Sequence, residues 1–389
     1  MAGKVTDGMS AAPVRIPGAR TLGSPRFRML IASVVVGIVG VLLALLLLAR
    51  AGSPTGQFGI DATDYLTAAE RISVGASPYA AEMLGGPVDA QGTDRYRYPP
   101  TLAQLLVPLV ALDHGNALWL LMWLQLLAIA TAIGLALRMS GQLRPEPALW
   151  AAAATVLFLP VFDSLWKGNV SGFLALLVVL AARGGATGGV AVGWATLLKI
   201  APVTFVPPWL ALDRRSRWGM VLVTLGTVAI SALLAPTAWR DYLSVLPNLV
   251  AGSADQPTNV APWAMVARSG APAPVGDIVR VLSLAAAVAA TVASVVVIRR
   301  PGGLPAAATL ATAAMLLLPA ALWYHYLVVL LPLAILAWPT ATRSERVALV
   351  TSGAFVTAGV AVLPLATIGG TALLLITLRA QSRRIPVGP

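Results

Sequence analysis

The sequence predicts an all-α protein that crosses a membrane many times. Hydrophobic residues make up 58% of the 389-residue chain, charged residues only 11%, and the mean hydropathy is +0.82, whereas a soluble domain is about 25% charged. Long apolar runs recur from Met29 to Leu378, and a run of roughly 18 or more such residues is typical of a membrane-spanning helix. A transmembrane barrel is disfavoured, because its strands alternate in short segments of about ten residues.

The apolar runs predict about twelve spans within one membrane domain, residues 29–379, if a span takes about 20 residues and some are shorter. The predicted spans are 29–49, 101–112, 115–138, 148–162, 168–182, 188–212, 218–235, 275–298, 304–321, 324–338, 347–363 and 365–378. The first run is much longer than the core of a signal peptide, so we interpret it as a retained span. Residues 1–28 are expected to be a disordered, basic cytoplasmic arm, and residues 380–389 a cytoplasmic tail.

The basic residues predict the orientation. Arginines cluster at 213–217, 299–300, 343–346 and 379–384, and clusters of this kind favour the cytoplasmic side. Residues 50–100 and 236–274 then form two outer loops, although Arg138 and Arg144 also fall outside and break the pattern. The net charge of +12 follows from this topology, and no basic patch interleaved with aromatic residues predicts a nucleic-acid partner. The chain has no cysteine, which excludes disulfides and thiolate chemistry.

The first outer loop is acidic. It holds 6 of the 15 acidic residues, namely Asp61, Asp64, Glu70, Glu82, Asp89 and Asp94. Apolar side chains in 61–75 recur at helical spacing, which predicts a short amphipathic helix at the membrane face. Asp61 and Asp64 would share one side of that helix. The pair Pro99-Pro100 closes the loop and allows a new helix to begin at Pro100.

Two carboxylates and a lysine are the first candidates for chemistry. Asp61 or Asp64 could take a proton from a sugar hydroxyl, or they could belong to a solvated acidic face or a helix cap. The Asp-x-x-Asp spacing is a poor metal signature, so no metal is expected. Lys199 lies within a predicted span, where a lysine costs about 2.5–3.5 kcal/mol and is functional by default. It could contact a lipid phosphate, or extend toward the membrane edge.

His325 is one of only two histidines, and aromatic residues flank it at positions 323, 324 and 326. A neutral imidazole is a suitable proton acceptor, although a membrane histidine can also be a hydrogen-bonded core residue. Residues 163–173, including Lys167 and Asn169, could be no more than a tight polar turn. Asn259 and Trp263 lie in the second outer loop, where a tryptophan suits either a sugar ring or the interfacial aromatic belt. His114, in a turn on the opposite side, is given no role.

These pieces occur in a recognisable order. The chain has Asp61-Ala-Thr-Asp-Tyr65, then Gly75 to Tyr79, Tyr96-Arg-Tyr-Pro-Pro100, Lys199-Ile-Ala-Pro202, Asn259 with Trp263, and Pro319 to Tyr326 around Trp323 and His325. In this order the chain resembles glycosyltransferase family 87 of actinobacteria, membrane mannosyltransferases of the GT-C type that use polyprenyl-phosphate mannose. It departs from the family at Asn169 and Ser171, where the family has Gln and Asn, and at Tyr326, where the family has a second His.

The resemblance implies a GT-C-type bundle in the plasma membrane with its active site outside. It implies an inverting, cofactor-free transfer of a hexose, expected to be mannose, from a polyprenyl-phosphate donor to a glycolipid or polysaccharide acceptor. Asp61 and His325 are the implied base and its partner, in either order. Expected substrate contacts are Asp64, Tyr65, Arg97, Tyr98, Asn169, Lys199, Asn259, Trp263, Trp323 and Tyr324. The alternative is a transporter or lipid flippase, which would often show internal repeats; none is evident.

Overall fold

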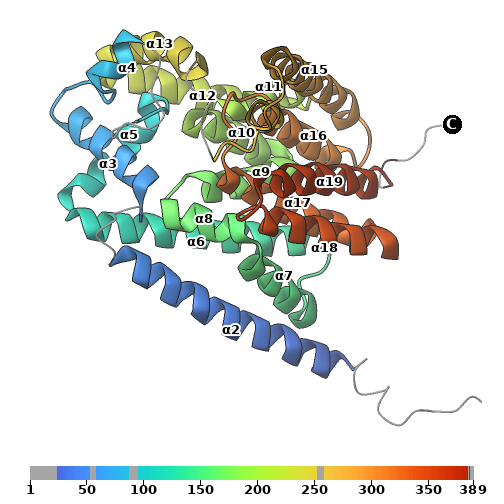
Figure 1. Ribbon diagram of the computed structural model, residues 1–389. Helices are drawn as coiled ribbons and strands as arrows, with labels where there is room; N and C mark the ends of the chain where they lie inside the picture. The colour runs from blue at the N-terminus through green and yellow to red at the C-terminus, as the bar shows by residue number, and fades with distance from the viewer. Residues whose placement is uncertain (1–23, 53–57, 87–94, 252–257, 384, 386–389) are drawn as a thin grey trace, which may run out of the picture.

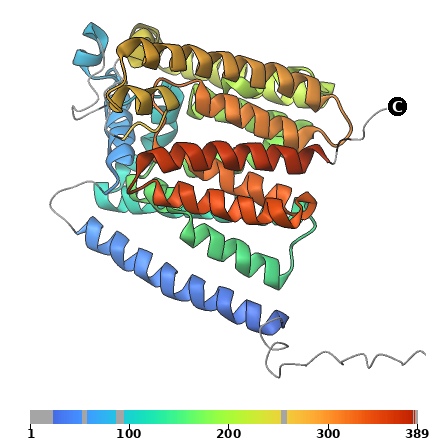
Figure 2. The same cartoon turned by 45° about the vertical axis from the view of Figure 1, so that its right-hand side comes forward.

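A computed structural model describes residues 24–52, 58–86, 95–251, 258–383 and 385. Their regular secondary structure is helical, apart from one isolated bridge between Asn259 and Trp323. Most of the basic arm 1–28 and half of the tail 380–389 lie outside the described residues, as do Asp89 and Asp94. Figures 1 and 2 show long helices lying side by side in a bundle, with the short helices α3, α4 and α5 across one end.

In the described part of the chain, five helices are long and apolar enough to cross a membrane. They are α2 (Pro25–Ala51), α6 (His114–Met139), α12 (Arg214–Leu234), α15 (Ala273–Ile298) and α19 (Leu363–Ser382). A sixth candidate is the bent pair α7 (Pro145–Leu157) and α8 (Leu159–Lys167), whose axes differ by 61°. Further helices of the bundle are shorter: α9 (Ser171–Arg183), α10 (Gly185–Leu198), α16 (Leu304–Leu317), α17 (Leu330–Ala337) and α18 (Arg343–Ala358). The membrane class is therefore supported, but the count of twelve spans is not confirmed.

Helical structure is interrupted after α7, α10 and α16. The interruptions lie close before, or at, Asp163, Lys199 and His325. The predicted span 188–212 is not continuous: α10 ends at Leu198 and Lys199 is extended, with φ −156° and ψ 146°. Pro202 explains this end, because a proline ring clashes with the carbonyl four residues earlier and supplies no N–H. The chain continues as the short helices η2 (Ala201–Phe205) and α11 (Val206–Leu210).

The other two breaks have the same origin. Pro160 follows the bend between α7 and α8, and Pro319 follows the end of α16, after which the 3₁₀ helix η3 (Tyr324–Val329) leads into α17. Threonine hydroxyls bond backbone carbonyls beside two of the breaks: Thr101 donates to Leu197 at 2.9 Å and Thr357 to Leu157 at 3.0 Å. Such contacts allow broken helices to persist inside a membrane protein.

The two ends of the bundle differ in charge. The α3 end is covered by α3 (Ile60–Ser73), α4 (Ala81–Gly85), α5 (Pro100–Leu106) and α13 (Pro236–Ala251), whereas the opposite end holds the start of α2 and the end of α19 (Figure 1). We call the opposite end the basic end, because α6 and α19 finish there with Arg138 and Arg383, and α12 and α18 begin there with Arg214 and Arg343.

Arg138 and Arg144, which broke the predicted charge pattern, lie at a different end of the bundle from the one predicted. Arg28, in the first turn of α2, pairs with Glu146 in the first turn of α7 at 2.7 Å. The connection that holds Arg138 and Arg144 therefore lies at the basic end, not with the acidic loop. His114 lies at the α3 end and not on the opposite side as predicted, because its Nε2 is 3.2 Å from Thr63 Oγ1 on α3.

The two predicted outer loops contain helices. The amphipathic helix predicted at 61–75 forms as α3, and α5 begins at Pro100 as expected. The apolar side of α3 does not face lipid, because Tyr65 and Leu66 are buried against α5 and the 3₁₀ helix η1 (Val107–Ala111). Residues 101–112, predicted as a span, form α5 and η1 instead. The second loop contains α13 and α14 (Pro262–Arg268).

Candidate active site

A close approach of α3 to the connection between α8 and α9 places Asp61. Gly168 has a left-handed backbone, with φ 67°, and a Cβ there would lie 2.5 Å from the Cβ of Ala62. The N–H of Gly59 donates to the carbonyl of Trp166 at 2.8 Å. Only glycine fits at position 168, because it tolerates a positive φ and has no side chain to clash with Ala62. Asp61 consequently lies over the residues that follow Gly168, with its side chain 27% exposed.

Asn169 joins Asp61 to two tyrosines. Its buried amide nitrogen donates to Asp61 Oδ2 at 2.7 Å and lies 3.2 Å from the hydroxyls of both Tyr65 and Tyr98. Its amide oxygen accepts from the N–H and the hydroxyl of Ser171, at 3.0 and 2.6 Å. An amide has two N–H donors and one acceptor oxygen, so every polar atom of Asn169 is used. The residue is a fixed connector between α3 and α9.

Tyr65 and Tyr98 remain neutral. Their hydroxyls are hydrogen-bonded at 2.8 Å. Burial raises the pKa of both phenols, and the negative charge of Asp61 raises them further. Each therefore keeps its proton at physiological pH and presents a hydroxyl, not a second negative charge, beside Asp61.

His325 lies between two carboxylates. Its Nδ1 is 3.2 Å from Asp163 Oδ2 on α8, and its Nε2 is 3.9 Å from Asp61 Oδ2. The ring is 3% exposed, and Nε2 has no hydrogen-bond partner in the described structure. Asp163 also pairs with Lys167 at 3.5 Å, one turn along α8. The result is a row of three side chains, Asp163–His325–Asp61, whose exposed member is Asp61.

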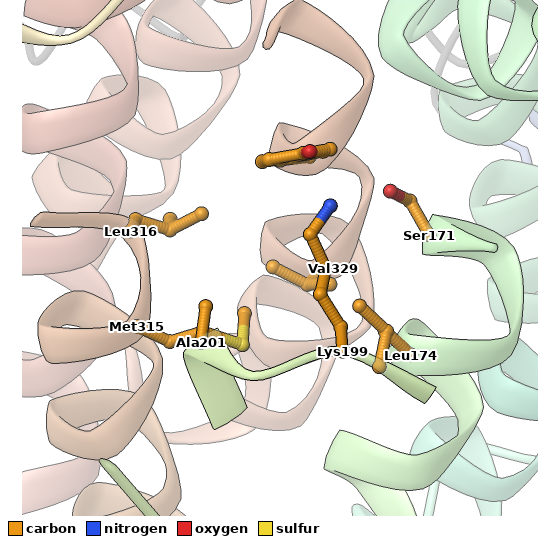
Figure 3. A pocket seen from close by; sticks show the side chains of 8 residues that line it. Ser171, Leu174, Lys199, Ala201, Met315, Leu316 and Val329 are labelled. Carbon is orange, nitrogen blue, oxygen red and sulfur yellow. The ribbon is translucent and has the colours of Figure 1, made fainter. Parts of the chain in front are cut away.

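Lys199 provides a buried cation on the other side of Tyr98. Its Nζ lies 3.2 Å from the centroid of the Tyr326 ring and 5.4 Å from that of Tyr98, and it has no hydrogen-bond partner among the described residues. The amine and the Ser171 hydroxyl point toward one small pocket (Figure 3). Apolar side chains line the rest of the pocket: Leu174, Ala201, Met315, Leu316 and Val329. A cation beside an apolar wall suits an anion that carries a hydrocarbon chain.

Comparison with known proteins identifies the family. The model of glycosyltransferase family 87 matches residues 96–323, more than half of the chain. The chain belongs to glycosyltransferase family 87. Over 167 residues it is also 29% identical to an alpha-(1->3)-arabinofuranosyltransferase of Corynebacterium glutamicum. That similarity covers 40% of this chain and 39% of the relative, so the chain matches less than half the length of that protein.

The family match includes part of the cluster and ends near it. Tyr98, Asp163, Asn169 and Lys199 lie within residues 96–323, whereas Asp61 precedes the matched range and His325 follows it. The structure brings both flanking residues to the matched ones. Of the predicted site residues, Asp61, Tyr65, Tyr98, Asn169, Lys199 and His325 therefore gather in one place. Within the described residues, no three His, Asp or Glu side chains are placed to share a metal ion.

Two residues of this family 87 protein that were expected to contact the substrate, Asn259 and Tyr324, instead form hydrogen bonds with the backbone. Asn259 accepts from the N–H groups of Ala261 and Leu322 at 3.0 Å each, and donates to the carbonyl of Ala320 at 3.0 Å. These bonds, with the bridge to Trp323, tie the chain before α14 to the segment before His325. The Tyr324 hydroxyl donates to the carbonyl of Val356 at 2.9 Å.

The other predicted substrate contacts include Trp263, Asp64 and Arg97, which lie outside the group formed by Asp61, Asn169 and His325. The guanidinium of Arg280 lies 5.3 Å from the ring centroid of the buried Trp263. Asp64 is half-buried on α3, one turn beyond Asp61. Arg97 precedes Tyr98 and lies close enough to Lys199 for the two cations to repel each other.

Sequence reasoning missed Asp163 and Tyr326. The sequence presents Asp163 only as the first residue of a polar turn, and Tyr326 only as the replacement of a second histidine. A signal for Asp163 was present, because an acidic side chain inside an apolar run is expensive and needs a partner. The partner itself could not be found from spacing, since His325 lies 162 residues away.

Proposed function

We propose that this family 87 protein transfers a sugar from a polyprenyl-phosphate donor to a lipid- or polymer-linked glycan acceptor at the α3 end. The observation that carries the proposal is that a partly exposed carboxylate and a buried lysine lie on either side of Tyr98. Asp61 is joined to Tyr98 through Asn169, and the Lys199 amine, which has no hydrogen-bond partner among the described residues, lies over the Tyr98 ring. Such a pair suits a reaction that removes a proton from one group while negative charge develops on another.

The proposed chemistry is one displacement. The acceptor hydroxyl attacks the anomeric carbon while its proton passes to Asp61 or His325. The bond between the anomeric carbon and the phosphate oxygen breaks, and its electron pair leaves with the phosphate, whose charge Lys199 stabilises. In-line attack inverts the anomeric configuration. Phosphate is a good leaving group, so no general acid is needed, and the apolar side chains beyond Lys199 are proposed to contact the first part of the polyprenyl chain.

The donor sugar is proposed to be a hexose, mannose, from the motif pattern around Asp61, Lys199 and His325. The name of the Corynebacterium relative favours a second candidate, an arabinofuranosyl donor, because that protein is 29% identical over part of the chain. Both donors would carry the same phosphate and lipid. The position of Lys199 therefore supports the donor class without distinguishing the sugars.

The proposed setting is the plasma membrane, with the basic end in the cytoplasm and the α3 end outside. The arginines gathered at the basic end support this orientation through the positive-inside tendency. A donor flipped to the outer leaflet would then reach Asp61 and Lys199 from the lipid, and the acceptor would approach from the surface over α3.

A membrane assay tests the proposal. Membranes with the full chain are incubated with radiolabelled polyprenyl-phosphate mannose or polyprenyl-phosphate arabinose and a panel of lipid-linked acceptors. The wild type should transfer label from one donor, and Asp61→Asn should lower transfer by about 10²–10⁴-fold, the usual contribution of a general base.

Glu146→Gln is the matched control, because it makes the same carboxylate-to-amide change at the basic end and should leave transfer unchanged. Undiminished transfer by Asp61→Asn would contradict the site. Failure of the wild type with both donors, together with movement of labelled lipid between leaflets, would favour the flippase alternative.

A further inference from the structure

Asp163 is placed to control which nitrogen of His325 carries the proton. An ionised carboxylate only accepts hydrogen bonds, so the 3.2 Å contact between Asp163 Oδ2 and Nδ1 requires a proton on Nδ1. A neutral imidazole has one N–H. Its Nε2 then carries a lone pair. This atom lies 3.9 Å from Asp61 Oδ2 and has no hydrogen-bond partner among the residues that the structure describes.

The two carboxylates compete for the same ring. If Asp61 held the ring proton, Nε2 would be the donor and could not accept a proton from a substrate. Asp163 has the advantage, because its oxygen is within hydrogen-bond distance and that of Asp61 is not. The side chain of Asp163 is also less exposed, 14% against 27%, and a less solvated charge acts more strongly on its neighbour.

The surroundings keep Asp163 ionised and fixed. Lys167 pairs with the same Oδ2 oxygen at 3.5 Å, which favours the charged carboxylate. The next residue, Ser164, is fully buried and donates to Gln125 Oε1 on α6 at 3.1 Å, so α8 is anchored beside Asp163. Tyr326 closes the other side of the ring, with centroids 4.8 Å apart. The groups that face His325 are therefore Asp61, Asp163, Lys167 and Tyr326.

We propose that Asp163 is a positioning residue that holds His325 as the Nδ1–H tautomer, so that Nε2 and Asp61 Oδ2 are two acceptors aimed at one hydroxyl. A gap of 3.9 Å is too long for a direct hydrogen bond, but one oxygen atom can contact both ends of it. During transfer the proton leaves the acceptor hydroxyl for one of these two atoms. If it goes to Nε2, the imidazolium is stabilised by a carboxylate on each side. The tautomer rests on geometry alone, and its catalytic use rests on the proposed function.

Nitrogen NMR of the full chain tests the tautomer without any substrate. The chain has only two histidines, so ¹⁵N-histidine labelling in lipid nanodiscs gives two rings, and His114→Gln assigns them. Above the ordinary imidazole pKa of about 6.5, the wild-type His325 should be protonated at Nδ1 and bare at Nε2. Asp163→Asn should move the proton to Nε2, because Asp61 is then the only charged acceptor facing the ring. Asp61→Asn should leave it on Nδ1.

An Nε2–H tautomer in the wild type, or an unchanged tautomer in Asp163→Asn, would overturn the inference even if sugar transfer is confirmed. In the transfer assay, Asp163→Asn should lower kcat by at least about 10²-fold, in the range of general-base effects, with little change in the KM for donor. Asp163→Glu should restore part of the rate. Equal losses in both variants, or a change in KM alone, would indicate a merely structural residue. Glu146→Gln should alter neither the tautomer nor the rate.

Discussion

At the scale of single residues, Lys199 is the most costly feature of the site. A lysine within a membrane domain costs about 2.5–3.5 kcal/mol on insertion scales, and a desolvated cation–π contact returns about 2 kcal/mol or more. The Tyr326 ring therefore offsets much of the cost, but the amine still has no hydrogen-bond acceptor in the described structure. In the proposed function, the phosphate of the donor would supply this acceptor.

The contact between Lys199 and Tyr326 predicts a graded response. Lys199→Met should lower sugar transfer by about 10–100-fold, since a hydrogen bond to a charged group is worth about 1.5–3 kcal/mol. Tyr326→Phe keeps the ring that holds the amine and should lose less activity than Tyr326→Leu, which removes it. Transfer rates in membranes normalised to protein amount provide the measurement. Equal effects of the Phe and Leu variants would show that the ring does not position Lys199.

At the scale of elements, the site depends on how closely α3 lies to the α8–α9 connection. Gly168 is the point of contact, and Asn169 immediately after it holds Asp61. Helix breaks supply the facing groups: α8 with Asp163 follows the bend after α7, Lys199 follows α10, and His325 follows the irregular chain after α16. Irregular backbone inside a membrane protein is tolerated where protein surrounds it or where it lines a cavity, and here three residues of the candidate site lie in it or close after it.

Replacement of this glycine should separate α3 from the cluster. Gly168→Ala combines left-handed strain of about 1–2 kcal/mol with overpacking of about 1–3 kcal/mol, and we expect both lower thermal stability and loss of transfer. Gly75→Ala is the matched control, because Gly75 also has positive φ, 77°, but a Cβ there meets nothing within 4 Å. Gly75→Ala should lower thermal stability through backbone strain but leave sugar transfer unchanged. If Gly168→Ala retained full transfer, the close approach would not be needed to place Asp61.

At the scale of the whole molecule, the charged groups divide between the two ends. The acidic α3 end holds the candidate site, and the basic end is tied together by ion pairs such as Arg28–Glu146 and Arg383–Glu345. Surface ion pairs of this kind contribute little stability. These ion pairs are informative about topology, because each joins helix ends that lie on the same side of the bundle.

Labelling of single cysteines can test this arrangement, since the chain has no cysteine of its own. Leu143→Cys and Ser344→Cys, both at exposed positions of the basic end, should react from the same side of the membrane. Ser73→Cys and Ser269→Cys, exposed at the α3 end, should react from the other side. A membrane-impermeant thiol reagent on intact cells and inverted vesicles provides the measurement. Labelling of position 143 together with position 269 would restore the predicted outer location of Arg138 and Arg144.

The sequence by itself predicted the membrane class and the amphipathic helix α3, and its resemblance to family 87 singled out Asp61 and His325 as candidate site residues. These features are local: apolar composition shows in any window, and a rare titratable group is noticeable against it. Only the tertiary structure decided that Asp163 holds His325, that Tyr326 holds Lys199 and that α3 covers protein and not lipid. Each of these depends on a contact between residues far apart in the chain, where spacing carries no information. Two of the proline breaks, those after α10 and α16, contribute residues to one pocket, and this also depends on contacts that the sequence does not show.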